Sequence, residues 1–240
     1  MYNLIIMDMK KEQNAEDKIP ISDLRIEKGL KSHPHEVSPW RIFKIMAEFV
    51  SGFEFLRRFD RTVSFFGSAR CSLEHEMYQE ATKLAKKLSE NGFTIVTGGG
   101  PGVMEAANKG AYEVGGRSVG LNIQLPSEQR SNPFVKDSEF FSYFFTRKVM
   151  LSFASEAYVF FPGGFGTLDE LFEMITLIQT KKIYPVPVML VGKDYWQPLL
   201  QWIEKTVYEG NQAINKEDME IYHLVDTADE AFVLLQKLLS

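Results

Sequence analysis

The chain reads Pro162-Gly163-Gly164-Phe165-Gly166-Thr167-Leu168-Asp169-Glu170 between two apolar segments. Residues 157–161, just before it, have the composition of a buried strand, and apolar residues at helical spacing follow it. Glycines between a strand and a helix let the backbone approach a ligand closely, and the helix start offers unpaired N–H groups to an anion. The stretch therefore predicts a strand, a phosphate-binding turn and a helix in succession.

A second glycine-rich turn, Thr97-Gly98-Gly99-Gly100-Pro101-Gly102, follows a predicted strand at 93–97. It lacks the glycine spacing of the dinucleotide fingerprint and the Gly-Lys-Ser/Thr of a Walker A loop. In a parallel sheet both turns would converge at the carboxyl ends of the strands, where open α/β folds bind ligands. A tight turn that serves only helix–strand packing is the alternative, and the sequence leaves it open.

Strand and helix patterns alternate through most of the chain, which favours one doubly wound parallel α/β sheet with helices on both faces. The predicted strands are 62–66, 93–97, 118–123, 140–144, 157–161, 186–191 and 223–225. The predicted helices are 75–91, 102–114, 147–155, a segment ending near 181, 195–208 and a last one from 227. We expect a single domain over 38–240, with a helical extension at 39–59 that Ser38-Pro39 begins, and an irregular arm at 1–37.

The composition excludes several classes of protein. A net charge of −5 and a pI near 5.5 argue against a general nucleic-acid binder, which carries a basic footprint. The lone cysteine, Cys71, excludes an intrachain disulfide and fits a reducing compartment. No apolar run is long enough to span a bilayer, so the sequence predicts a cytoplasmic protein without membrane partners.

Glu170 can be interpreted in two ways. Thr167-x-x-Glu170 has the pattern of a capping box, in which the threonine caps the helix and the glutamate binds the cap N–H. A phosphate cradle has no need of a carboxylate one turn into the helix. With the glycines in front of it, a buried carboxylate beside a bound phosphate is the better explanation.

Basic residues also point toward the predicted cleft. Arg147-Lys148 opens a predicted helix, where a cation pair opposes the helix dipole unless an anion lies nearby. Arg70, which follows Gly67-Ser68 in the loop after the first strand, offers similar but weaker evidence. Glu105, just inside the other glycine turn, either faces the same cleft or favours its helix start.

Metal chemistry finds little support in the sequence. The four histidines are scattered, without a His-Glu-x-x-His motif or a cysteine cluster: His33, His35, His75 and His223. Cys71 has no recognisable base and is interpreted as a packing residue. We therefore expect neither a metal nor an organic cofactor.

Three motifs together resemble the Lonely Guy (LOG) family, which was long labelled "lysine decarboxylase". They are residues 98–108, Arg147-Lys148-Val149-Met150 and residues 162–170. The resemblance covers about residues 40–225 and implies a Rossmann-like fold and phosphoribohydrolase activity. A purine nucleoside 5′-monophosphate, either AMP or its N6-modified cytokinin form, is then cleaved to the free base and ribose 5-phosphate.

The resemblance also implies a set of site residues. The family's catalytic arginine and glutamate correspond to Arg147 and Glu170. Its glycine motif corresponds to Gly163, Gly164, Gly166 and Thr167. Further contacts to phosphate and ribose are expected from Gly99, Gly100, Lys148, Ser68 and Glu105. Plant-type members carry Gly-Leu-Met-Gly where this chain has Gly102-Val103-Met104-Glu105, so the preferred base stays open.

The chemistry fits these residues. Breaking the C1′–N bond develops positive charge on the ribose, which a carboxylate can stabilise while it orients the attacking water. Arg147 either pairs with Glu170 or contacts the ribose or the leaving base. Two alternatives remain: a non-catalytic nucleotide or cofactor carrier, like the molybdenum-cofactor carriers, and a single-stranded DNA binder, which the acidic balance disfavours.

The helix at 39–59 predicts self-association. Its apolar residues extend over much of its circumference, and they include Trp40, Phe43, Val50 and Phe53. Such a helix cannot leave its second side in water without a sizeable apolar patch. The extension is similar to that of the longer, bacterial-type branch of the family, which implies a homodimer or a higher homo-oligomer.

Overall fold

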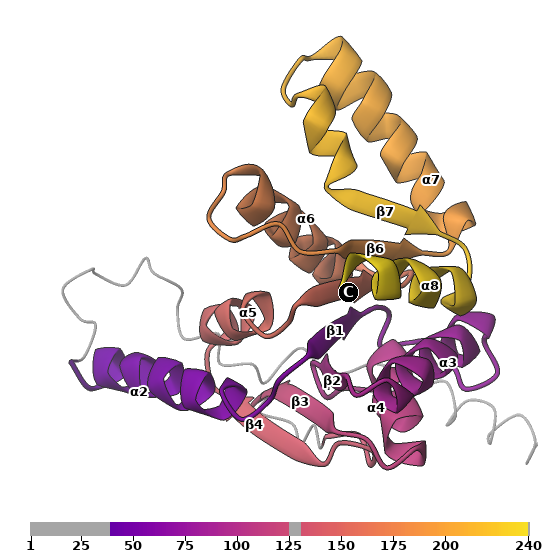
Figure 1. The fold of residues 1–240 in the computed structure, drawn as a ribbon. Coiled ribbons are helices and arrows are strands. Elements are labelled where there is room, and N and C mark those ends of the chain that lie inside the picture. Colours follow the sequence, from indigo (N-terminus) through magenta and orange to yellow (C-terminus); the bar gives the residue numbers. More distant parts are fainter. Residues whose placement is uncertain (1–38, 125–130, 240) are drawn as a thin grey trace, which may run out of the picture. The chain divides into compact units, whose positions relative to one another are not determined.

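Parallel strands alternate with helices in the computed structural model of this protein, which describes residues 39–124 and 131–239 (Figure 1). The described strands are β1 (Thr62–Phe66), β2 (Thr94–Thr97), β3 (Ser118–Ile123), β4 (Asp137–Phe141), β5 (Ala157–Phe160), β6 (Val188–Val191) and β7 (Tyr222–Val225). They form one sheet in the order β4-β3-β2-β1-β5-β6-β7, and every neighbouring pair is parallel. The predicted doubly wound α/β sheet is confirmed.

Helices cover both faces of this sheet. They are α2 (Pro39–Leu56), α3 (Glu76–Glu90), α4 (Val103–Glu113), α5 (Phe144–Ser152), α6 (Phe165–Gln179), α7 (Lys193–Trp202) and α8 (Ala228–Leu238). A π-helix, η2 (Ile203–Gly210), continues α7, and a 3₁₀ helix, η3 (Lys216–Glu220), precedes β7. The sequence predicted one regular helix at 195–208 and missed η3.

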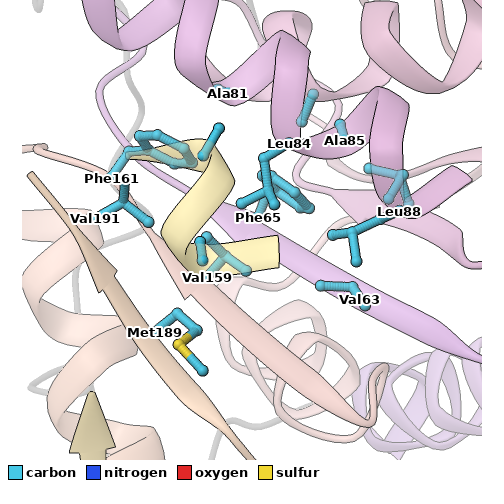
Figure 2. Packing of buried hydrophobic residues seen from close by; sticks show 14 of the residues in the cluster. Val63, Phe65, Ala81, Leu84, Ala85, Leu88, Val159, Phe161, Met189 and Val191 are labelled. Atoms are coloured by element: carbon cyan, nitrogen blue, oxygen red, sulfur yellow. The ribbon is translucent and has the colours of Figure 1, made fainter. Parts of the chain in front are cut away.

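Alternate strand residues point to opposite faces, so the sheet separates two cores. On one face Val63, Phe65 and Val159 pack under α3, as Figure 2 shows, together with α4 and α8. On the other face Phe66 and Phe160 stack with ring centroids 4.9 Å apart, among residues of α2, α5, α6 and α7. Strands buried on both faces explain the nearly continuous apolar runs in the sequence.

The region of β4 and α5 differs from the prediction. The sequence predicted a strand at the aromatic residues 140–144, but pairing with β3 begins at Asp137 and the strand ends at Phe141. Glu48 explains the end: its carboxylate accepts hydrogen bonds from Ser142 N at 2.8 Å and from the Thr146 hydroxyl at 2.6 Å. Since α5 begins at Phe144, the predicted helix start at 147 is wrong.

The amino-terminal prediction is tested only in part. Contacts group the chain from Phe43 onward as one compact unit. The arm expected at 1–37 and the Ser38 cap lie outside the described residues, whereas Pro39 does occupy the first helical position. Gly52 and Phe55 are the buried residues of α2, but Met46, Val50 and Phe53 remain 43–65% exposed.

Candidate active site

Three loops meet at the carboxyl ends of β1, β2 and β5. Ser68 N, after β1, donates to Pro162 O at 3.0 Å, and Val103 N donates to Ser68 O at the same distance. Ser68 thus joins the two glycine-rich turns through backbone hydrogen bonds. The sheet order reverses direction at β1, which is the position where open α/β sheets bind ligands.

A cleft of about 640 Å³ opens at this edge of the sheet. Among the residues predicted for the site, those that line it are Ser68, Arg147, Lys148, Gly164, Gly166, Thr167 and Glu170. Its apolar lining, which the sequence analysis did not single out, comes from Phe66, Met104, Phe144, Leu151 and Phe165. The aromatic run was a signal for Phe144, but we interpreted that run as a strand.

The turn after β5 is open to the cleft. Gly164 caps α6 without any side-chain hydrogen bond, and the helix begins at Phe165. A Cβ on Gly164 or Gly166 would meet no atom within 4 Å, whereas one on Gly163 would lie 2.1 Å from the Thr167 hydroxyl. Gly163 is therefore needed for packing, and the other two leave the backbone N–H groups accessible to an anion.

The capping-box interpretation of Glu170 is wrong. Because α6 begins at Phe165, Thr167 is its third residue rather than its cap, and its side chain is buried. Glu170 lies in the second turn of the helix and lines the cleft. By contrast, Thr227 does cap α8 and accepts a hydrogen bond from Glu230 N at 3.3 Å.

Arg147 lies against the turn after β2. Its Nε donates to Leu121 O at 2.7 Å and its Nη2 to Gly98 O at 3.4 Å. A Cβ on Gly98 would lie 2.2 Å from that Nη2. Burial lowers the pKa of the guanidinium and the negative Glu170 opposes that change, yet arginine stays cationic in proteins. The backbone thus fixes a permanent positive charge in the cleft.

The Glu170 carboxyl is half-buried, and burial raises its pKa to about 7. The nearby cations Lys148 and Arg147 lower this pKa, whereas the carboxylates of Glu173 and Asp169 raise it. Within the described residues no ion pair shorter than 4 Å joins Glu170 to Arg147, so direct pairing is not the arrangement. The carboxyl therefore titrates near neutral pH, which suits acid–base and electrostatic work.

Four predicted site residues do not line the cleft, and one of them is Gly163, which packs against Thr167. Gly99 and Gly100 line a hollow of about 200 Å³ that shares Gly98 and Arg147 with the cleft. Glu105 lines a separate hollow with Cys71 and Pro101, and it accepts a hydrogen bond from the Tyr78 hydroxyl at 3.1 Å. The structure thus places Glu105 outside the cleft, in contact with α3.

The described part of the chain has neither a group of three His, Cys, Asp or Glu side chains that could hold a metal ion nor a helix long and apolar enough to cross a membrane. His33 and His35 lie outside that part.

The fold and the cleft define a doubly wound α/β protein whose ligand site combines an open helix start with a buried arginine and glutamate. The chain belongs to the family described as "Possible lysine decarboxylase", whose model matches residues 104–235, and its relatives are the LOG proteins. This confirms the family resemblance.

Two plant relatives illustrate the similarity. The chain is 36% identical over 158 residues to the "Probable cytokinin riboside 5'-monophosphate phosphoribohydrolase LOGL5" of Oryza sativa subsp. japonica, which covers 64% of this chain and 63% of that protein. It is 31% identical over 185 residues to the "Cytokinin riboside 5'-monophosphate phosphoribohydrolase LOG5" of Arabidopsis thaliana, a match that covers 75% of this chain and 78% of that protein. The match thus spans less than two thirds of the rice protein.

Among solved structures, the molybdenum cofactor carrier protein of Chlamydomonas reinhardtii matches 75% of this chain and 98% of its own, with a TM-score of 0.58. At 22% identity this likeness shows the fold alone.

Proposed function

We propose that this protein hydrolyses the N-glycosidic bond of a purine nucleoside 5′-monophosphate and releases the free base and ribose 5-phosphate. One observation carries the proposal: a half-buried Glu170 with a pKa raised to about 7 shares a cleft with Arg147 and the open start of α6. The names of the plant relatives support the same reaction.

Each part of the cleft has a task in this reaction. The α6 start, with Gly164 and Gly166, binds the 5′-phosphate, and this remote binding energy holds the ribose at the reacting position. The ionised Glu170 stabilises the positive charge that develops at C1′ and orients or deprotonates the attacking water. The base leaves with the electron pair of the broken C1′–N bond and gains a proton, while water supplies the new hydroxyl at C1′.

Arg147 is proposed to contact the ribose or the leaving base. Its guanidinium is held by the Leu121 and Gly98 carbonyls rather than by an ion pair with Glu170. The Phe144, Met104 and Leu151 side chains offer an apolar wall for a purine. A panel of AMP and its N6-modified forms tests which base this wall prefers.

The experiment is chromatographic analysis of products from nucleoside 5′-monophosphates, with adenosine as the matched control. We expect adenine and ribose 5-phosphate from AMP or its N6-modified forms and far less release from adenosine, because adenosine lacks the phosphate anchor. Equal rates on AMP and adenosine would refute the phosphate anchor. Tight nucleotide binding without product from any monophosphate would favour a non-catalytic carrier instead.

We also propose that the protein is a homo-oligomer, at least a dimer. Met46, Val50 and Phe53 keep 43–65% of their surface exposed on α2, and Phe53 makes an edge-to-face contact with Phe153, which is also exposed. Contiguous exposed apolar surface of this kind marks an interaction site. Light scattering at micromolar concentration tests it, and a stable, active species of about 27.5 kDa would contradict the proposal.

A further inference from the structure

Lys148 links α5 to α6 beside the candidate catalytic carboxylate. Its ammonium Nζ lies 2.5 Å from Asp169 Oδ2 and 3.0 Å from Glu173 Oε2. These two carboxylates lie on either side of Glu170 along α6. The Lys148 and Glu173 side chains are only 25% and 27% exposed, so water screens this ion pair less than one on an open surface.

We propose that Lys148 is a positioning residue that binds Asp169 and Glu173 and thereby keeps the intervening Glu170 ionised for the reaction. This inference deepens the proposed function and rests on it. It assigns to Lys148 a role distinct from the substrate contact expected from the sequence, since the ammonium group already lies within ion-pair distance of two carboxylates.

The charge balance around Glu170 supports this role. Three carboxylates within five residues of one helix repel each other, and burial adds to the cost of charging the middle one. Burial is the largest influence that raises the pKa of Glu170, and Lys148 is the largest that lowers it, ahead of Arg147.

Other groups that face Glu170 cannot replace Lys148. From β5, Tyr158 stays neutral, because burial and the Glu170 charge both raise the pKa of its hydroxyl. Arg147 is fixed on two backbone carbonyls and forms no short ion pair with the carboxylates of α6 in the described structure. Loss of the Lys148 charge would therefore leave Asp169 and Glu173 to favour the protonated form of Glu170.

The first test is the pH dependence of kcat/KM for a nucleoside 5′-monophosphate in Lys148→Met. The rate should fall as pH drops through the pKa of Glu170, because only the ionised carboxylate acts. We expect the midpoint to move to higher pH by about one unit, so that the rate at pH 6 falls about tenfold while the rate at pH 9 stays within about threefold of wild type. Lys148→Arg keeps the charge and should restore the wild-type midpoint.

Two results would overturn the inference. A higher KM at every pH with an unchanged midpoint would mean that Lys148 binds the substrate. A uniform loss of rate with a lower melting temperature and an unchanged midpoint would mean that it only joins the helices. Glu173→Gln provides a second variant with the opposite sign: removing a like charge should move the midpoint to lower pH, and a shift to higher pH would contradict the charge argument.

A direct titration separates this inference from the proposed function. Carbon-13 NMR of protein labelled at the glutamate carboxyl carbon reports the Glu170 titration, with Glu170→Gln to assign its signal. If the wild type releases no base but Lys148→Met still raises the Glu170 titration midpoint, the proposed function fails and the positioning role holds. If base is released and the midpoint does not move, the positioning role fails.

Discussion

The two glycine-rich turns look alike in sequence but differ in the structure. The turn after β2 is closed by three side chains. Gly99 N donates to the Thr97 hydroxyl at 2.9 Å, and Asn132 Nδ2 donates to Gly100 O at 3.0 Å. The Gly98 carbonyl accepts a hydrogen bond from Arg147 Nη2 at 3.4 Å. The turn after β5 is open, since neither Gly164 nor Gly166 would place a Cβ within 4 Å of another atom.

This difference separates a scaffold from a ligand site. In the closed turn, side chains bind the Gly99 N–H and the Gly98 and Gly100 carbonyls, and the turn holds the cationic Arg147. In the open turn, α6 begins without a side-chain cap, so its first N–H groups have water or a ligand as partners. A strand–glycine–helix pattern alone therefore does not identify a phosphate site; what decides it is whether protein groups already bind the N–H groups of the turn.

The largest expected effect follows from the carboxylate that the open turn introduces. Glu170→Gln should lower kcat by about a thousandfold or more while nucleotide binding stays largely intact, because the amide keeps the shape but supplies no negative charge to the sugar. Steady-state kinetics together with calorimetric binding of AMP measures both. Near-normal turnover would remove Glu170 from the mechanism.

Stability provides the control for that variant. The pKa of Glu170 is raised from 4.5 to about 7 in the folded protein, so its stabilising contribution is full below about pH 4.5 and is lost as pH rises through 7. Glu170→Gln should therefore unfold at an equal or higher temperature than wild type at pH 8. A lower melting temperature there would indicate a structural role for the carboxylate.

Alanine at one glycine of each turn tests the comparison itself. Gly98→Ala places a methyl group 2.2 Å from Arg147 Nη2, so the guanidinium must move and kcat should fall about ten- to a hundredfold. In the matched variant Gly166→Ala, the added methyl group has no neighbouring atom within 4 Å. The melting temperature of this variant should therefore stay near wild type, and its effect should appear in KM. Kinetics and thermal unfolding of both variants measure this. If Gly98→Ala keeps its kcat, the closed turn does not position Arg147.

The smallest expected effect concerns the polar network behind the closed turn. Asn108 is fully buried; its Oδ1 accepts from Thr97 Oγ1 at 2.6 Å and from Asn132 Nδ2 at 2.9 Å. Asn108→Ala leaves these donors unsatisfied and should lower the free energy of unfolding by about 1–3 kcal/mol. Urea denaturation measures it, with the exposed Gln201→Ala as the control that should change little. Equal effects would mean that the network adds no stability.

Several features were predictable because they are local. The positions of β1, β3 and α3 followed from hydrophobic period and from Gly92, whose φ of +82° ends the helix. Arg147, Glu170 and the glycine turn were identified as site residues from motif and spacing, and the structure places Arg147, Glu170 and residues 164–167 around one cleft. The start of α5 was missed because Glu48, almost a hundred residues away, sets it.

The sequence by itself determined the alternation of strands and helices, the two glycine turns and the residue types that carry the chemistry, since these depend on near neighbours. Only the tertiary structure decided which turn is open, that Glu105 faces Tyr78 and that Lys148 joins Asp169 and Glu173 beside Glu170. The physical reason is that burial and charge balance sum over groups from several elements, and their distances are set only when the sheet brings those elements together.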